Sequence, residues 1–267
     1  MAMQATNRLQ KALRTDRGLS FGAWQMLPGA NHARLMARSG YDWICVDTEH
    51  GNIADWQMHE AVAAIAATGV SPIVRIAANE GWMERWILAR MALLSLFYIQ
   101  QMTPEGWLNR PSSPPVGRRG FGSPFAMGST GNVTGVEYLQ QANDALLTIV
   151  QIETKEALDN VEEIAKVPGI DVLFVGPWDL GNNIGRPVLG AFHDDLSAAI
   201  ERIRKAAADA GKRSGIYCVG GEAAKKYADQ GFHMISVVAD AVALPSYLSN
   251  ALETAQGGKS GATVPTY

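Results

Sequence analysis

The stretch LLTIVQIETKEALDNVEEIAKVPGIDVLFVGPWDLG, residues 146–181, decides the fold. It opens with an apolar run at 146–153, continues through a helix-like segment at 155–166 and closes with a second apolar run at 171–176. Both runs are apolar at consecutive positions, which is typical of parallel strands covered on both faces. A strand, a helix and a second strand in this order form one repeat of a parallel α/β sheet.

The same alternation runs through the rest of the chain. The other apolar runs are 19–24, 42–47, 71–76, 214–219 and 233–240, and the other helical candidates include 55–67, 194–210 and 221–229. Neither a G-x-G-x-x-G nor a phosphate-binding G-x-x-x-x-G-K-[ST] motif follows a strand, which disfavours an open nucleotide-binding sheet. We therefore predict an α/β protein with a (β/α)8 TIM barrel, a single domain over residues 1–255, and a flexible tail over 256–267.

One part of the chain departs from this pattern. Seven strands are legible, and the remaining one is expected between Ile76 and the glycine-rich basic loop PPVGRRGFGSP, residues 114–124. The intervening region, about 88–113, has weak strand patterning and no clean helix after it, although the spacing is about normal for a barrel. We expect the region of strand 4 to be anomalous. A segment read in a shifted frame is one hypothesis for it, which transcript sequencing would test.

Composition excludes several classes of partner and site. The 267 residues are 47% apolar with a net charge of −3 and no block of Lys or Arg, which argues against nucleic acids and acidic membranes as partners. The two cysteines, Cys45 and Cys218, each lie in an apolar run and indicate a reducing compartment. Residues 1–18 contain no apolar signal core, and the longest apolar stretch, 86–99, is too short to span a bilayer. We expect a soluble, cytoplasmic protein.

Two carboxylates follow the two strands quoted above. Glu153 lies just past the first strand and Asp179 lies three residues past the second. Neighbouring parallel strands are about 4.8 Å apart and end at the same rim of a barrel, so the two side chains can reach one ion. Two carboxylates with positions left for water and substrate suit Mg²⁺ or Mn²⁺ better than zinc. The alternative is that Asp179 caps a turn and Glu153 pairs with Lys155.

Two further sets of polar residues are candidates for the site, one at the end of a predicted strand and one within a strand. DTEHG, residues 47–51, puts Asp47, Glu49 and His50 where barrel enzymes hold reactive groups, and a histidine there can exchange protons near neutral pH. His50 could also be no more than a hydrogen-bonded turn residue. Arg75 lies in the apolar strand PIVRI and needs an anionic partner, either Glu49 or another carboxylate, or a substrate carboxylate or enolate.

Six ordered motifs resemble the HpcH/HpaI aldolase family, the class II metal-dependent 2-oxo acid aldolases related to macrophomate synthase. They are Gly22-Ala-Trp24, DTEHG, PIVRI, PPVGRRGFG, VQIET and FVGPWDLGNNIG, and the match runs collinearly from Gly22 to Asp240 outside 88–113. The resemblance implies a barrel, one divalent metal ion (Mg²⁺, Mn²⁺ or Co²⁺) and a homo-oligomer, usually a hexamer of exchanged-helix dimers. It also implies reversible aldol cleavage of a 4-hydroxy-2-oxo acid to pyruvate, or a related 2-oxo acid, and an aldehyde through a metal-bound enolate.

The resemblance assigns roles to residues of this chain. Glu153 and Asp179 match the metal ligands, His50 matches the base, and Arg75 matches the residue that stabilises the enolate. The implied substrate contacts are Gln151, Trp178 through its backbone N–H, Gly176, Pro177 and Trp24, with Asp47 and Glu49 in support. Family members carry an Asp that orients the base, and it would fall where this chain reads Ala89-Arg90-Met91. An imidazole without its orienting carboxylate loses basicity and its fixed tautomer. If residues 88–113 are as printed rather than read in a shifted frame, we predict a destabilised barrel with reduced or absent aldolase activity.

Other readings remain open at this point. A macrophomate-synthase-like or oxaloacetate-decarboxylating enzyme would form the same enolate by losing CO₂. A citrate-lyase-β-like enzyme acting on CoA thioesters is weaker, because nothing in the sequence indicates a nucleotide pocket. A catalytically impaired barrel kept for binding is the non-enzyme alternative. The sequence does not specify the aldehyde, since Trp178 replaces a residue that is often smaller in the family and borders the predicted pocket.

Overall fold

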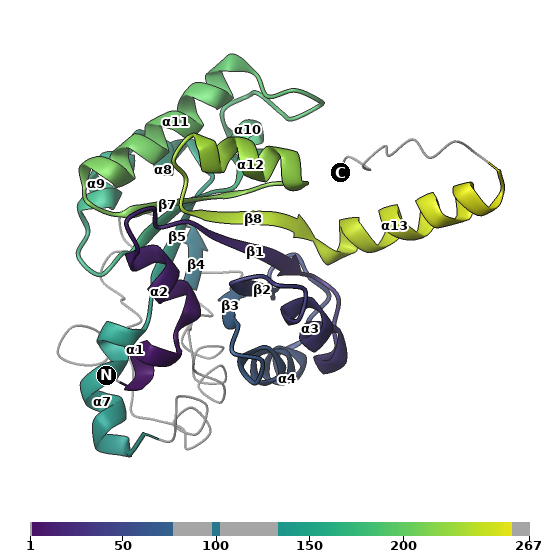
Figure 1. Ribbon diagram of the computed structural model, residues 1–267. Helices are drawn as coiled ribbons and strands as arrows, with labels where there is room; N and C mark the ends of the chain where they lie inside the picture. Colours follow the sequence, from purple (N-terminus) through teal and green to yellow (C-terminus); the bar gives the residue numbers. More distant parts are fainter. Residues whose placement is uncertain (1, 77–97, 102–132, 258–267) are drawn as a thin grey trace.

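The chain folds into a closed parallel barrel of eight strands, as seen in the computed structural model, which describes residues 2–76, 98–101 and 133–257 (Figure 1). The strands pair in chain order, and β8 returns to β1. They are β1 (Ser20–Gln25), β2 (Trp43–Asp47), β3 (Ser71–Arg75), β4 (Tyr98–Gln101), β5 (Thr148–Ile152), β6 (Val172–Val175), β7 (Arg213–Tyr217) and β8 (Met234–Ala239). The predicted α/β class and parallel barrel are confirmed, and the seven legible strands lie within two residues of their predicted bounds.

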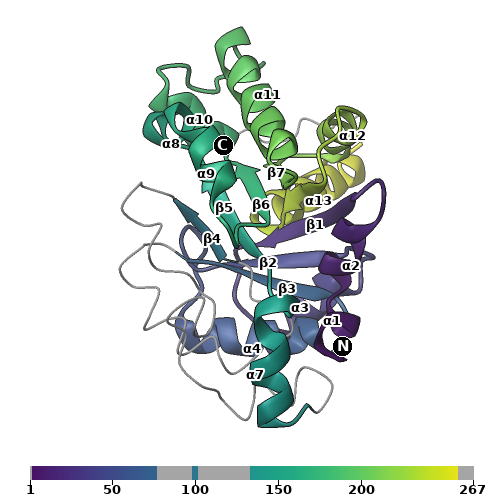
Figure 2. The ribbon, with the colours of Figure 1, turned by 90° about the vertical axis from the view of Figure 1, so that its left-hand side faces the viewer.

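Helices surround the barrel, as the view turned by 90° shows (Figure 2). They are α1 (Ala2–Thr6), α2 (Arg8–Arg14), α3 (Ala30–Ala37), α4 (Asp55–Ala66), α7 (Gly135–Ala145), α8 (Lys155–Asp159), α9 (Val161–Lys166), α10 (Pro177–Asn183), α11 (Asp194–Asp209), α12 (Gly221–Asp229) and α13 (Asp240–Ala255). The single helix predicted over 155–166 is wrong. Asn160 has non-helical dihedral angles and its side-chain amide donates to the Glu156 carbonyl at 2.9 Å, a local bond that competes with the helix and divides it into α8 and α9.

The strand that the sequence did not show is β4, which lies between β3 and β5 in the interval predicted for it. It is only four residues long, and β3 matches it at two positions. The rest of the region predicted to be anomalous, the basic loop at 114–124 and positions 89–91 lie outside the described residues. So does nearly all of the predicted tail, because only Gln256 and Gly257 follow α13 within them.

Large aromatic rings fill the barrel beneath its C-terminal end. Trp24 packs edge-on against Trp43, with ring centroids 6.2 Å apart, and lies 5.6 Å from Phe174. Two strand glycines make room for them. A Cβ on Gly22 would lie 2.0 Å from the Trp43 indole, and one on Gly215 would lie 2.4 Å from the Phe174 ring. The interior is therefore a packed layer of side chains on which the site is built.

The N-terminal helices cover the opposite end of the barrel. Asn7 is fully buried, and its side-chain amide donates to the Ala145 carbonyl at the end of α7 at 2.8 Å. The Leu9 N–H donates to the hydroxyl of Ser71, the first residue of β3, at 3.0 Å. Helices α1 and α2 therefore close the barrel at the N-terminal ends of the strands. The cavity described below lies at their C-terminal ends.

The last helix has a different environment. In Figure 1, α13 begins against β1 and β8 and then runs away from the barrel. Leu244, Tyr247, Leu248 and Leu252 are 46–74% exposed and follow a helical spacing that puts them on one face. None of the helices within the described ranges is long and apolar enough to cross a membrane.

Candidate active site

A cavity of about 380 Å³ opens at the C-terminal ends of the strands. It contains most of the site residues predicted from the sequence. The residues that line it are Trp24, Met26, Asp47, His50, Arg75, Gln151, Phe174, Gly176, Pro177, Trp178, Asp179 and Tyr217. Glu49 and Glu153 do not line the cavity themselves, but each contacts a residue that does. Glu49 pairs with Arg75, and Glu153 accepts a hydrogen bond from Gln151.

One side of the cavity, which we call the arginine wall, consists of Trp24, Asp47, Glu49 and Arg75. The parallel register of β2 and β3 places Asp47 directly beside Arg75. Two nitrogens of the Arg75 guanidinium donate to the Asp47 carboxylate. Nε donates to Oδ1 at 2.8 Å, and Nη2 donates to Oδ2. The third nitrogen, Nη1, lies 3.2 Å from Glu49. The sequence left the partner of Arg75 open, and the structure assigns it two protein carboxylates.

Asp47 is the centre of this wall. It is fully buried and also accepts hydrogen bonds from the Trp24 indole at 3.1 Å and from the backbone N–H groups of Glu49 and His50 at 3.0 and 3.1 Å. Burial alone would raise the pKa of Asp47, but these hydrogen bonds and the charge of Arg75 outweigh it and lower that pKa. Asp47 is therefore ionised at neutral pH and holds Arg75 in one orientation.

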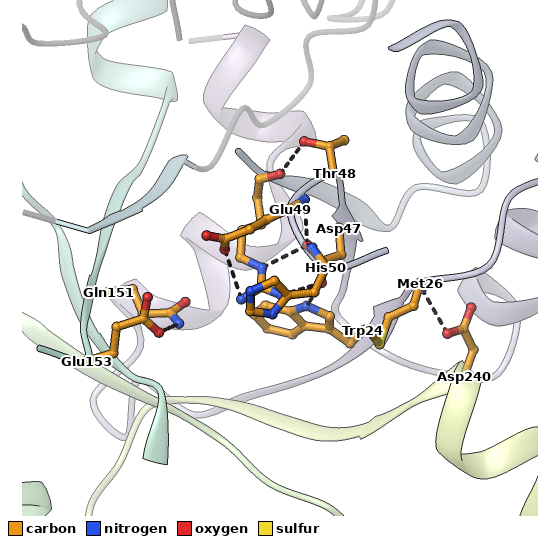
Figure 3. Close-up of polar contacts among 10 residues, drawn as sticks. Trp24, Met26, Asp47, Thr48, Glu49, His50, Gln151, Glu153 and Asp240 are labelled. Atoms are coloured by element: carbon orange, nitrogen blue, oxygen red, sulfur yellow. Dashed lines mark hydrogen bonds and ion pairs between the residues drawn. The ribbon is translucent and has the colours of Figure 1, made fainter. Parts of the chain in front are cut away.

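Glu49 is influenced by both sides of the cavity. Burial raises its pKa, Arg75 opposes that shift, and the negative charges of Asp47 and Asp179 add to it. The influence of Asp179 shows that the carboxylate after β6 lies within electrostatic range of the group after β2. Figure 3 shows Asp47, Glu49 and His50 together, with Gln151 and Glu153 on the other side.

The second side, the carboxylate wall, consists of Gln151, Glu153, Gly176 and Asp179. The Glu153 side chain is buried, and Gln151 donates to it from Nε2. A Cβ on Gly176 would lie 2.6 Å from Glu153 Oε2 and 2.7 Å from Gln151 Nε2, so only glycine leaves room for these two polar groups at the end of β6. Lys155, the alternative partner for Glu153, instead pairs with Asp159.

The carboxylate wall suits a cation in two respects. Gln151 Oε1 is buried and has no hydrogen-bond partner among the residues that the structure describes. This acceptor oxygen therefore lies beside the carboxylates without a donor. Within the same ranges, Asp47, Glu49, Glu153 and Asp179 bring four carboxylates to the cavity against one guanidinium, Arg75. No group of three or more His, Cys, Asp and Glu side chains in this part of the chain is arranged to hold a metal by itself. A site of two carboxylates must therefore be completed by oxygen ligands from water or substrate.

His50 lies at the mouth of the cavity. It is exposed, and within the described ranges only its backbone N–H has a hydrogen bond, to Asp47. This backbone bond belongs to the turn after β2, so a role for the imidazole stays a prediction. The orienting carboxylate expected near 89–91 lies outside the described residues.

Three lining residues were missed by sequence reasoning. Phe174 and Tyr217 lie within apolar strands, where a run of consecutive apolar residues does not reveal which side chains point inward. Met26 is positioned by Asp240, which accepts its N–H at 2.8 Å and also contacts His32 Nε2 at 2.7 Å. Asp240 follows β8 directly, so the rule that polar residues at strand ends are functional could have found it.

Comparisons with known proteins identify the family of this chain. Residues 108–245 match the family described as HpcH/HpaI aldolase/citrate lyase. The hydroxypyruvate/pyruvate aldolase of Paraburkholderia phytofirmans is 35% identical over 244 residues, which are 88% of this chain and 92% of that one. This chain belongs to the HpcH/HpaI family. The resemblance predicted from the motifs is confirmed, and so is the enzyme class, because the relatives are aldolases and therefore lyases.

Solved structures of the HpcH/HpaI family share the fold. A family protein from Burkholderia cenocepacia has a TM-score of 0.81 and 32% identity, with 94% of this chain and 99% of that chain covered. Macrophomate synthase has a TM-score of 0.82 over 96% of this chain and 91% of that one, but its 22% identity establishes the fold alone. The relatives above 30% identity are aldolases, so the decarboxylase alternative is not favoured.

Proposed function

We propose that this chain is a divalent-metal-dependent carbon–carbon lyase that cleaves a 4-hydroxy-2-oxo acid reversibly to pyruvate, or a related 2-oxo acid, and an aldehyde. The observation that carries this proposal is a small cavity with an oriented guanidinium on one wall and two carboxylates beside an unsatisfied amide oxygen on the other. The relative named hydroxypyruvate/pyruvate aldolase supports the substrate class.

Glu153 and Asp179 would hold the metal ion, which we take to be Mg²⁺, Mn²⁺ or Co²⁺. The fit rests on the oxygen donors and on the excess of negative charge along the carboxylate wall, which a hard divalent cation would offset. When bound, such an ion supplies Lewis acidity toward the oxygens of a 2-oxo acid. Gln151 would turn its unsatisfied Oε1 to a ligand oxygen that carries a proton or to bound water.

Arg75 places a positive charge where negative charge develops during cleavage. Its bonds to Asp47 and Glu49 fix the guanidinium before the substrate arrives, so no reorganisation is needed when the enolate forms. Trp24 stacks under the same group, with its ring centroid 5.4 Å from Arg75 Cζ. Gly176, Pro177 and the backbone N–H of Trp178 are proposed to hold the substrate carboxylate at the end of β6.

His50 is proposed to move the proton. In cleavage the imidazole takes the proton from the C4 hydroxyl, the C3–C4 bond breaks, and its electron pair passes into the enolate of the 2-oxo acid. The C4 fragment leaves as the aldehyde, and the enolate takes a proton at C3 to give pyruvate. Condensation reverses these steps, so no oxidant or reductant is required.

The direct test follows pyruvate release from 4-hydroxy-2-oxo acids with Mn²⁺ present, and CO₂ release from oxaloacetate in parallel. Aldol cleavage faster than decarboxylation is the expected result. Decarboxylation that clearly exceeds cleavage would replace this proposal with the macrophomate-synthase-like alternative.

The loss of the orienting carboxylate predicts a lower rate than a complete site would give. The matched comparison is the chain as it stands against a version with Asp-Gly in place of Met91-Ala92. A large gain in retro-aldol turnover is expected from the restored version. Equal, substantial turnover by both chains would remove the predicted impairment.

We also propose a homo-oligomer, as the relatives' family pattern implies, in a cytoplasmic setting. The apolar face of α13, defined by Leu244, Tyr247, Leu248 and Leu252, is exposed in the single chain and would be covered by a second copy. Light scattering after gel filtration should report a species of several chains, and Tyr247→Glu with Leu248→Glu should shift it toward smaller species. A monomeric wild-type chain would contradict this.

A further inference from the structure

A second, larger cavity adjoins the first at the C-terminal end of the barrel. It has a volume of about 820 Å³ and lies between the segment 188–192, which precedes α11, and the segment 218–227, which includes most of α12. Trp178 and Tyr217 line both cavities. The rings of these two residues meet edge to face, with centroids 5.6 Å apart, and both residues are half-buried.

The aromatic contact continues on both sides of this boundary. Trp178 also packs edge-on against Phe192 at 5.9 Å, inside the larger cavity. Tyr217 packs edge-on against Trp24 at 5.4 Å, inside the smaller one. A row of rings therefore leads from the arginine wall to the larger cavity, and its exposed faces offer apolar and aromatic surface to a ligand that extends from one to the other.

The lining of the larger cavity specifies the kind of ligand. Most of it is apolar, with Val188, Leu189, Phe192, Val219 and Ala223 beside the shared rings. Its two charged residues, Glu222 and Lys226, are exposed and of opposite sign, so the lining carries no net charge. Burial raises the pKa of the Cys218 thiol to about 12, so this residue adds no charge either. The surroundings favour an uncharged apolar group over an anionic one.

We propose that this larger cavity binds the apolar substituent of the aldehyde, while the carbonyl end lies in the smaller cavity. The inference rests on the proposed aldolase function and adds a substrate class to it. An aldehyde with an aryl or long alkyl chain would bridge the two cavities past Trp178 and Tyr217. A volume of about 380 Å³ holds the 2-oxo acid and a short aldehyde, and a longer substituent has the adjoining 820 Å³ to enter.

The test fills the larger cavity without touching the smaller one. Ala223→Phe adds a ring to a half-buried position in the lining. Gly221→Leu is the second variant, because a Cβ there meets no atom within 4 Å. Lys225→Phe is the matched control, since it puts the same ring on an exposed position of α12 outside the lining. Thermal unfolding of each variant verifies that it folds, and Gly221→Leu carries the test if Ala223→Phe does not fold.

Two readouts are needed. The first is kcat/KM for condensation of pyruvate with 3-phenylpropanal and with acetaldehyde. The wild-type chain should prefer 3-phenylpropanal by about tenfold or more, and the filling variants should lose about tenfold of that ratio while Lys225→Phe keeps it. The second is calorimetric binding of the unreactive alcohol 3-phenylpropan-1-ol, which should bind the wild type and Lys225→Phe and be weakened by the filling variants.

The outcomes separate this inference from the function beneath it. No turnover of any aldehyde, with alcohol binding that the filling variants abolish, would refute the proposed aldolase reaction and leave the apolar site standing. An unchanged aldehyde ratio and unchanged alcohol binding in both filling variants would overturn the site. So would a wild-type chain that does not bind the alcohol.

Discussion

The arginine wall and the carboxylate wall face one cavity but differ in how many of their polar atoms have partners within the protein. On the arginine wall, Asp47 is buried among donors and all three guanidinium nitrogens of Arg75 have carboxylate partners. On the carboxylate wall, Gln151 keeps a buried oxygen for which the described part of the chain provides no donor. A buried polar atom without a hydrogen bond lowers the stability of the fold. The polar atoms of the arginine wall have partners within the protein, whereas we expect Gln151 Oε1 on the carboxylate wall to find its partner in a bound ligand.

This difference implies different effects of substitution. A change on the arginine wall should reduce the stability of the fold as well as its activity. A change on the carboxylate wall should reduce ligand binding and activity while the fold remains. Substitutions at Arg75, Glu153 and Gln151 separate the two walls, and a fourth at Asp171, at the opposite end of the barrel, is expected to have the smallest effect.

Arg75→Ala should have the largest effect. It leaves the fully buried Asp47 carboxylate without its counter-charge, which typically costs about 3–5 kcal/mol. Urea unfolding followed by far-ultraviolet circular dichroism measures the loss. The double variant Asp47→Asn with Arg75→Leu should recover part of it, because the uncompensated charge is gone. A loss of less than about 1 kcal/mol in Arg75→Ala would show that the ion pair does not support the fold.

Glu153→Gln should lower kcat/KM for aldol cleavage by about 10²–10³-fold at saturating Mn²⁺, because one of the two metal-binding carboxylates is lost. The matched control is Glu156→Gln, which neutralises an exposed glutamate on neighbouring α8. The control should behave as wild type in the pyruvate-release assay. Equal activity of Glu153→Gln and wild type would remove Glu153 from the site.

Gln151→Leu should raise KM about tenfold, since it removes the unsatisfied acceptor and its one hydrogen bond to a ligand. Leucine has a similar volume and removes the unsatisfied Oε1, but it also removes the Nε2 donor to the buried Glu153 carboxylate, so the free energy of unfolding should fall by about 1 kcal/mol. Initial rates against substrate concentration, with urea unfolding on the same sample, test both parts. A large stability loss with unchanged KM would place Gln151 with the structural residues.

The smallest predicted effect concerns the other end of β5 and β6. Asp171 accepts the Thr148 N–H at 2.7 Å, and burial raises its pKa from 3.8 to about 6. Because the folded pKa is above the unfolded one, the stabilisation from protonated Asp171 is complete below about pH 4 and is lost as the pH rises to 6. Asp171→Asn should therefore gain stability relative to wild type across that window, on the order of 1 kcal/mol because Asp171 is only partly buried.

Melting temperatures of both proteins from pH 4 to 7 measure this difference. The gain should grow with pH and level off above 6. A gain that is constant with pH would mean that the pKa of Asp171 is not raised by folding.

The sequence was sufficient for the fold because parallel strands covered on both faces leave consecutive apolar runs. It was insufficient where local chemistry competes, as at Asn160, and where the pattern is weak, as at Tyr98–Gln101. The site residues were predictable as types at strand ends. Their partners were not, because the pairing of Asp47 with Arg75 depends on strand register, which spans residues far apart in the chain. Phe174 and Tyr217 were missed because inward and outward apolar residues look alike in a buried strand.

The central claim is that the carboxylate wall holds a divalent ion. Calorimetric titration of Mn²⁺ into the metal-free protein, into Glu153→Gln and into Glu156→Gln tests it without any assumption about the substrate. Wild type and Glu156→Gln should each bind one Mn²⁺ per chain, and Glu153→Gln should bind it at least about tenfold more weakly, with an unchanged melting temperature of the metal-free form. Equal Mn²⁺ affinity and stoichiometry in all three proteins would contradict it.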